Sequence, residues 1–234
     1  MIAKMCAKFN SFNFHGCALK SKVSLVEEGA TKKGKEEMLR NVYGSAINGI
    51  ESTIVTIEVT VEKGINFLIV GLPDNSVKES QQRISTALNH YGYKIPGKRI
   101  VINMAPADLR KEGASYDLPL AIGILSASEQ ITADEVEEYI IMGELSLDGN
   151  LRKIRGALPI AIEAQRQGYK KLILPKENAK EAAIVSGITI YGATNIQEVI
   201  EHLEGTTKIE TEEVDIEEEI SKSLENYEYD FKDV

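Results

Sequence analysis

The sequence contains no tryptophan, and only two of its 234 residues are cysteines. Both cysteines, Cys6 and Cys17, lie near the N-terminus, with His15 between them. A structural zinc site takes four such ligands, and a disulfide framework needs more cysteines than these two. The sequence therefore predicts neither a metal site nor a disulfide-stabilised fold.

The sequence also lacks long hydrophobic segments. It has no run of the roughly 18 apolar residues that a membrane-spanning helix requires. Its first residues carry charge but no continuous apolar stretch of the kind found in secretory signals. These absences predict a cytoplasmic protein without a membrane partner.

Basic residues are too few for a strong, sequence-independent nucleic-acid-binding protein. The chain has 27 Lys and Arg against 36 Asp and Glu, a net charge of −9. Since such binding depends on many contacts between cations and phosphates, any DNA contact by this domain alone should be weak and come from local groups of cations. Three groups fall in predicted loops: Lys94, Lys98 and Arg99; Arg110 and Lys111; and Arg152, Lys153 and Arg155. They form a positive stripe if they share a face, and are otherwise ordinary surface charge.

Composition and pattern divide the chain into three parts. Residues 1–38 show no sustained hydrophobic period and predict a disordered N-terminal extension. Residues 39–205 alternate apolar strands with amphipathic helices, which predicts a two-layer α/β (α+β) domain with a mixed sheet. Residues 206–234 are strongly acidic and predict a solvated linker.

The expected elements of the central part follow from hydrophobic periodicity. Strands are predicted at 53–62, 67–70, 99–104, 139–145, 151–154, 172–174 and 188–191, with 139–145 and 151–154 forming a hairpin. Helices are predicted at 76–90, 120–127, 159–167, 179–185 and 196–203.

The stretch from Ala105 to Pro119 is the most informative. It is a charged loop between an apolar strand and a helix whose body, residues 120–127, is almost entirely apolar. A helix N-terminus after such a loop has unpaired backbone N–H groups, so a site is expected here if the domain has one. Ser115, with Asp117 as a competing candidate, is expected to cap this helix.

This stretch also carries a family resemblance. The segments Asn103–Leu125, Phe67–Ser80 and Met142–Ala161 together resemble the N-terminal domain of the magnesium-chelatase-like AAA+ ATPases of the ComM/YifB type. The similarity covers residues 39–205 and implies a fold like the proteolytic domain of Lon protease. It also implies a bacterial cytoplasmic protein that forms a homo-oligomeric ring, and in ComM a branch-migration helicase acting in recombination during natural transformation.

The resemblance identifies Ser115 with the Lon nucleophile, because Lys111 to Ser115 reproduces the local pattern K-[DE]-G-x-S. The catalytic Lys of Lon corresponds to Leu158 here, so the base that would activate the serine is missing. The resemblance therefore implies a non-catalytic accessory domain. The alternative is a Lon-like serine hydrolase with an atypical base, for which no spacing favours either Lys111 or Lys153.

A nucleotide-binding loop is not expected in this chain. Gly92 to Arg99 nearly matches G-x-x-x-x-G-K-[ST], but Arg99 replaces the hydroxyl that binds Mg²⁺. The loop also follows a predicted helix and precedes a strand, which is the reverse of the required order. The resemblance places ATP and Mg²⁺ in an ATPase module, and residues 230–234 resemble the entry to that module, so the sequence is expected to stop before it.

Overall fold

The computed structural model describes residues 39–214. The predicted N-terminal extension, the Cys6, His15 and Cys17 group, and residues 215–234 of the predicted linker lie outside the described residues.

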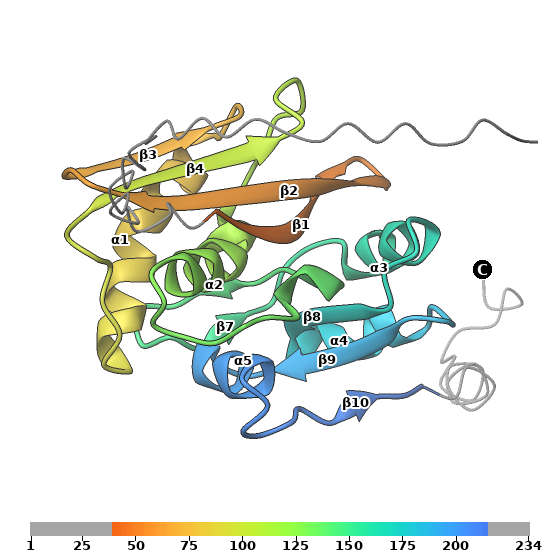
Figure 1. The fold of residues 1–234 in the computed structure, drawn as a ribbon. Coiled ribbons are helices and arrows are strands. Elements are labelled where there is room, and N and C mark those ends of the chain that lie inside the picture. The colour runs from red at the N-terminus through yellow and green to blue at the C-terminus, as the bar shows by residue number, and fades with distance from the viewer. Residues whose placement is uncertain (1–38, 215–234) are drawn as a thin grey trace, which may run out of the picture. The chain divides into compact units, whose positions relative to one another are not determined.

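The described residues form ten strands and five α-helices, most of which are labelled in Figure 1. The strands are β1 (Arg40–Asn48), β2 (Glu51–Glu62), β3 (Asn66–Val70), β4 (Arg99–Ala105), β5 (Tyr139–Ile141), β6 (Glu144–Leu145), β7 (Leu151–Arg152), β8 (Lys171–Pro175), β9 (Thr189–Ala193) and β10 (Thr211–Glu212). The helices are α1 (Asn75–His90), α2 (Asp117–Ala127), α3 (Ala157–Arg166), α4 (Lys176–Ala183) and α5 (Ile196–Leu203).

Eight strands form one mixed sheet in the order β10-β9-β8-β5-β1-β2-β4-β3, and β6 and β7 form a separate hairpin. Parallel pairs join β3 to β4 and run through β1, β5, β8 and β9. Antiparallel pairs join β1 to β2, β2 to β4 and β9 to β10. The expected α/β fold with a mixed sheet is confirmed.

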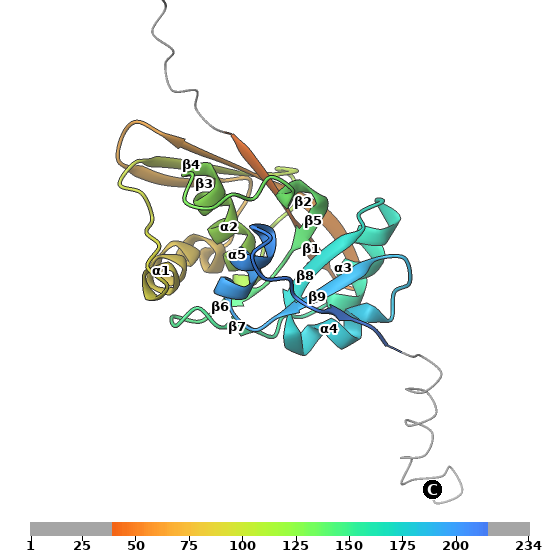
Figure 2. The same ribbon diagram turned by 60° about the horizontal axis from the view of Figure 1, so that its bottom comes forward.

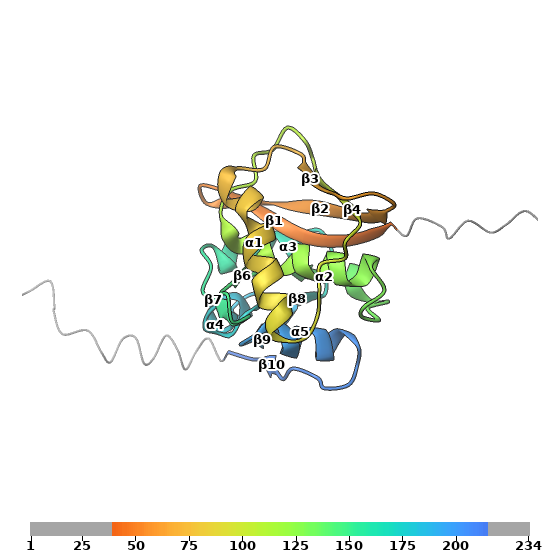
Figure 3. The ribbon, with the colours of Figure 1, turned by 90° about the vertical axis from the view of Figure 1, so that its left-hand side faces the viewer.

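Helix α2 is the centre of the core. All eleven of its residues are buried, as its nearly unbroken apolar sequence predicts. It packs on β1 and β2, and a Cβ at Gly123 would lie 2.7 Å from Cγ2 of Val59. Glycine at this position therefore allows the helix to approach the sheet closely. Figures 1 and 3 show α1 and α2 between the β2–β4 part of the sheet and the β8–β10 part.

The β8–β10 part of the sheet is covered on both faces. In Figure 1, α5 lies in front of β9 and α4 behind it, and both helices contact that strand. Its short parallel strands are fully apolar where they are central: residues 172–174 of β8 are completely buried. Such continuous apolar runs are typical of strands covered on both sides.

Most predicted elements are present, and the differences have physical reasons. Strand β1 was not predicted, because Gly44, Ser45 and Ala46 interrupt its apolar alternation. The segment predicted as one strand at 139–145 is divided into β5 and β6, so the hairpin pairs β6 with β7. The acidic stretch begins with β10, which pairs with β9, so the sheet extends beyond the boundary expected at Gly205. Residues 39–214 include no helix with the length and apolar character to cross a bilayer.

Candidate functional site

The loop after β4 is held against the turn that follows β3. The N–H of Lys111 donates to the carbonyl of Leu72 (3.2 Å), and the N–H of Asp74 donates to the carbonyl of Lys111 (3.0 Å). The turn approaches β4 so closely that a Cβ at Gly71, which has φ +98°, would lie 2.1 Å from the carbonyl oxygen of Met104. Glycine is required there because any side chain would collide with the strand.

The carboxylate of Asp74 fastens the same loop to α1. One oxygen accepts from the N–H of Val77 (2.8 Å) and caps α1, while the other accepts from the N–H of Gly113 (3.1 Å). One side chain therefore fixes the start of a helix and the loop that leads to Ser115.

Ser115 lies in a 3-10 turn (Ala114–Tyr116) immediately before α2, and its carbonyl accepts from the N–H of Gly143 (2.8 Å). No side chain caps this turn or the N-terminus of α2. The predicted cap by Ser115 or Asp117 is therefore wrong. The 3-10 turn runs directly into the helix, so neither residue occupies the extended backbone conformation that a capping residue needs.

Asp117 is instead the centre of a buried ion pair. Its carboxylate, with no exposed surface, accepts from Nε (2.7 Å) and Nη2 (2.9 Å) of Arg83. It also accepts from the hydroxyl of Ser80 (2.5 Å) and the N–H of Leu145 (3.3 Å). The hydrogen bond to Asp117 raises the pKa of the Arg83 guanidinium. This cluster joins α1, α2 and the β6–β7 hairpin. Sequence reasoning missed it, because an Arg on the face of a predicted helix does not indicate a buried partner.

Lys111 was predicted as a surface contact, and the structure contradicts this. The residue has 0% exposed surface, and its Nζ donates to the carbonyl of Pro106. Burial lowers the pKa of the amine, against a smaller opposing effect of Asp108. Lys111 therefore lies inside the loop and is not available there as a surface contact.

Leu158 lies in the first turn of α3, where the resemblance places the catalytic Lys. Its N–H donates to a carboxylate oxygen of Glu181 (3.2 Å). Within residues 39–214, the hydroxyl of Ser115 has no hydrogen-bond partner that could act as a base. The loop from Gly92 to Arg99 joins α1 to β4, which confirms the predicted helix-to-strand connection.

The other predicted contact residues are exposed but not all on one stripe. Arg99 is the first residue of β4, whereas Arg110 lies in the loop that follows the end of that strand at Ala105. Three of the cations form surface ion pairs: Arg99 with Glu62 (3.4 Å), Arg110 with Glu112 (3.0 Å) and Arg152 with Glu144 (3.8 Å). Lys94, Lys98, Lys153 and Arg155 have no ion pair with any residue from 39 to 214.

The segment after the β6–β7 hairpin is anchored by Asn178, a residue that the sequence analysis did not identify. Asn178 lies in the first turn of α4 and is fully buried. Its amide oxygen accepts from the N–H of Ile154 (2.9 Å), and its amide nitrogen donates to the carbonyl of Ile154 (2.9 Å). Ile154 is buried, whereas Lys153 and Arg155 on either side of it are exposed.

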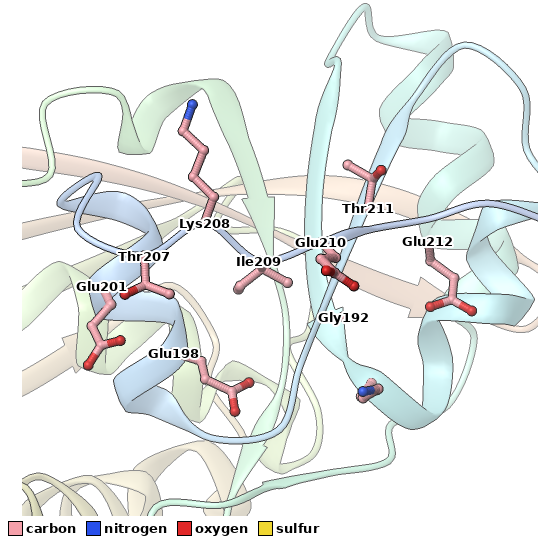
Figure 4. Close-up of a pocket in the computed structure, with 10 residues that line it drawn as sticks. Gly192, Glu198, Glu201, Thr207, Lys208, Ile209, Glu210, Thr211 and Glu212 are labelled. Carbon is pink, nitrogen blue, oxygen red and sulfur yellow. The ribbon is translucent and has the colours of Figure 1, made fainter.

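The hollows of the surface lie elsewhere. A pocket of about 310 Å³ lies between α5, β9 and residues 207–212, and Figure 4 shows the carboxylates of Glu198 and Glu201 on its wall. Glu198 already accepts from Thr194 and Asn195. Among residues 39–214, no three His, Cys, Asp or Glu side chains are placed to hold a metal ion.

The comparisons with known proteins agree with this architecture. Residues 57–178 match the family described as subunit ChlI of magnesium chelatase. The chain belongs to this family. It is therefore a domain of the magnesium-chelatase-like AAA+ type, and the resemblance inferred from the sequence is confirmed.

Individual relatives cover the same region. The chain is 43% identical to the competence protein ComM of Haemophilus influenzae over 169 residues, which are 72% of this chain and 33% of that protein. It is 44% identical to YifB of Escherichia coli over 170 residues, again 72% of this chain and 33% of that protein. Lon protease 2 of Bacillus subtilis is 31% identical over 192 residues, 74% of this chain and 34% of that protein. The chain spans about one third of the length of these relatives.

Proposed function

We propose that this chain is the non-catalytic N-terminal domain of a ComM/YifB-like AAA+ protein and contributes DNA or subunit contacts to DNA processing. The observation that carries the proposal is the state of the Lon-like positions: Leu158 replaces the base, and Lys111 is buried on the carbonyl of Pro106. A domain that retains the fold without assembling the catalytic pair is suited to an accessory role. The name of the relative ComM, a competence protein, supports a role in the handling of DNA.

In the whole protein, we propose that the domain acts within a homo-oligomeric ring in the cytoplasm and that ATP and Mg²⁺ bind a separate module. A ring presents the same weak contact several times, which raises its effective affinity without new contacts. A branch-migration helicase would use such contacts to keep DNA close to the ring.

DNA binding by the purified chain tests this proposal. Fluorescence anisotropy with a labelled duplex should show weak binding that falls steeply between about 50 and 200 mM salt. An absence of binding at the lowest salt would reject DNA contact by this chain and leave subunit contact.

A second candidate is a Lon-like serine hydrolase that uses Lys111 as its base. The similarity to Lon protease 2 favours it. Lys111 is the base to test because burial lowers the pKa of its amine, and a serine nucleophile needs a neutral amine, although Nζ lies on the carbonyl of Pro106 and not on the Ser115 hydroxyl. Treatment with a fluorophosphonate probe tests it. Stoichiometric labelling of Ser115, lost in Lys111→Met, would establish the hydrolase and overturn the accessory role.

A further inference from the structure

The β6–β7 hairpin and the loop between β7 and α3, residues 153–156, are fixed to the body of the domain at several points. The N–H of Leu151 donates to the carbonyl of Thr194 (2.8 Å), and the N–H of Ile196 donates to the carbonyl of Gly149 (3.0 Å). The amide of Asn178 then binds both backbone groups of Ile154. Figure 2 shows the β6–β7 hairpin between α1 and the strand β9 that holds it. The first two bonds hold the hairpin, and the Asn178 amide holds the loop that follows it at Ile154.

This anchoring determines which way the side chains of the loop face. Strand β7 ends at Arg152, so the exposure of each residue, and not strand alternation, shows the direction. Ile154 is buried, whereas Lys153 and Arg155 are both exposed. The two cations are therefore presented to solvent on either side of an anchored residue.

The acids near this loop do not neutralise the two cations. Glu181 accepts from the N–H of Leu158, and Glu144 lies 3.8 Å from Arg152. Glu181 belongs to α4, and its carboxylate binds the N-terminal turn of α3, so that turn is not part of the site. Lys153 and Arg155 have no ion pair with a described residue.

We propose that Lys153 and Arg155 form a preorganised contact for two successive phosphates of a DNA strand, and that Asn178 is its positioning residue. This inference rests on the proposed function and narrows it from eight candidate cations to two. Asn178 does not touch the DNA. It acts by removing the ordering cost that a free loop pays when its long side chains are immobilised.

The test is the salt dependence of DNA binding by the full chain, measured with a fluorescein-labelled duplex and its single strand. Lys153→Gln with Arg155→Gln should reduce the slope of log K against log salt on the duplex by about 0.9 per lost phosphate contact, or about 1.8 in total. Lys94→Gln with Lys98→Gln is the matched control, because it removes the same charge from exposed residues of another loop, and its slope should equal that of the wild type. Equal slope losses in both variants, or none in the first, would overturn the inference while leaving DNA binding intact.

Asn178→Ala separates positioning from contact. The two cations remain in this variant, so the slope should stay unchanged while the affinity falls about three- to tenfold through the cost of ordering the loop. Circular dichroism identifies a variant that fails to fold, and the first pair of variants then decides alone. An unchanged affinity in folded Asn178→Ala would overturn the positioning role, whereas no binding by the wild type would overturn the DNA contact in the proposed function and leave subunit contact.

Discussion

The loop from Pro106 to Asp117 and the loop from Arg152 to Arg155 both contain the charged residues that attract attention in the sequence, but the structure uses them in opposite ways. In the first loop two charged residues are turned inward, while Arg110 and Glu112 stay exposed: Lys111 is buried on a carbonyl, and Asp117 is buried against Arg83. In the second loop a buried amide holds the backbone, and the charges face solvent. The comparison shows that the segment that most resembles a catalytic site connects parts of the fold. Lys153 and Arg155, which have no ion pair with a described residue, lie instead just before Leu158, the residue that replaces the catalytic base.

The largest expected effect tests the structural role of the first loop. Asp117→Asn should lower the free energy of unfolding by about 3 kcal/mol, the lower end of the range for a broken buried pair, because Arg83 loses its counter-charge but is 22% exposed to water. Urea denaturation measures this change. The control is Glu112→Gln, which alters an exposed pair with Arg110 and should have little effect. A loss below about 1 kcal/mol in Asp117→Asn would show that the Asp117–Arg83 ion pair does not hold this part of the fold together.

The anchor of the second loop should have a smaller effect on stability. Asn178→Ala leaves the N–H and carbonyl of Ile154 without their partners, and we expect a loss of about 1–3 kcal/mol in urea denaturation. Asn195→Ala is a useful comparison, because it removes the cap of α5 rather than a buried anchor. If Asn178→Ala were as stable as the wild type, the loop would not depend on its amide.

The edge of the sheet provides a pH-dependent contrast to both loops. Nδ1 of His202 accepts from the N–H of Ile209 (3.0 Å), so the neutral ring carries its proton on Nε2, 3.2 Å from the Tyr139 hydroxyl. Burial, with Lys171 and Lys208 nearby, lowers the pKa of His202. The unfolded chain therefore takes up the proton first, at its ordinary pKa of about 6.5, and stability should fall as the pH drops below that value.

His202→Gln should remove this part of the acid sensitivity, since a neutral amide can still accept from Ile209. Thermal unfolding of the variant and the wild type between about pH 7.5 and pH 5 measures the difference. Curves that fall in parallel over this range would show that His202 does not couple the edge to pH.

The smallest effect is expected at Ser115. Because its side chain caps nothing, Ser115→Ala should change the unfolding free energy by no more than about 0.5 kcal/mol. The variant and the wild type should also be equally unable to degrade casein. A loss near 1 kcal/mol would restore the capping role that the sequence suggested.

The sequence predicted most of the fold because hydrophobic periodicity marks elements that bury one face or all faces. The range 196–203 coincides with α5, and the apolar run of 120–127 correctly predicted a fully buried helix. Strand β1 was not predicted, because its small residues suit close packing and break the alternation of apolar and polar residues. These residues make sense only once β2 and β5 lie beside them.

The site was less predictable because it depends on contacts between residues that are far apart in the sequence. Nothing in the sequence near Lys111 shows that its amine is buried, and its neighbours Arg110 and Glu112 are exposed charged residues. The amide of Asn178 reaches Ile154 across 24 positions of the chain, a pairing that no local pattern encodes. The absence of a catalytic base at Leu158 could be predicted, because the family resemblance identifies the position at which Lon has its catalytic Lys.

The most direct test of this account is a map of the contact between the full chain and DNA. Formaldehyde crosslinking to a duplex, followed by peptide mass spectrometry, compares the lysines within one sample. The account predicts crosslinked peptides that contain Lys153, with none at the buried Lys111. Crosslinks concentrated at Lys94 and Lys98, with Lys153 unmodified, would contradict it.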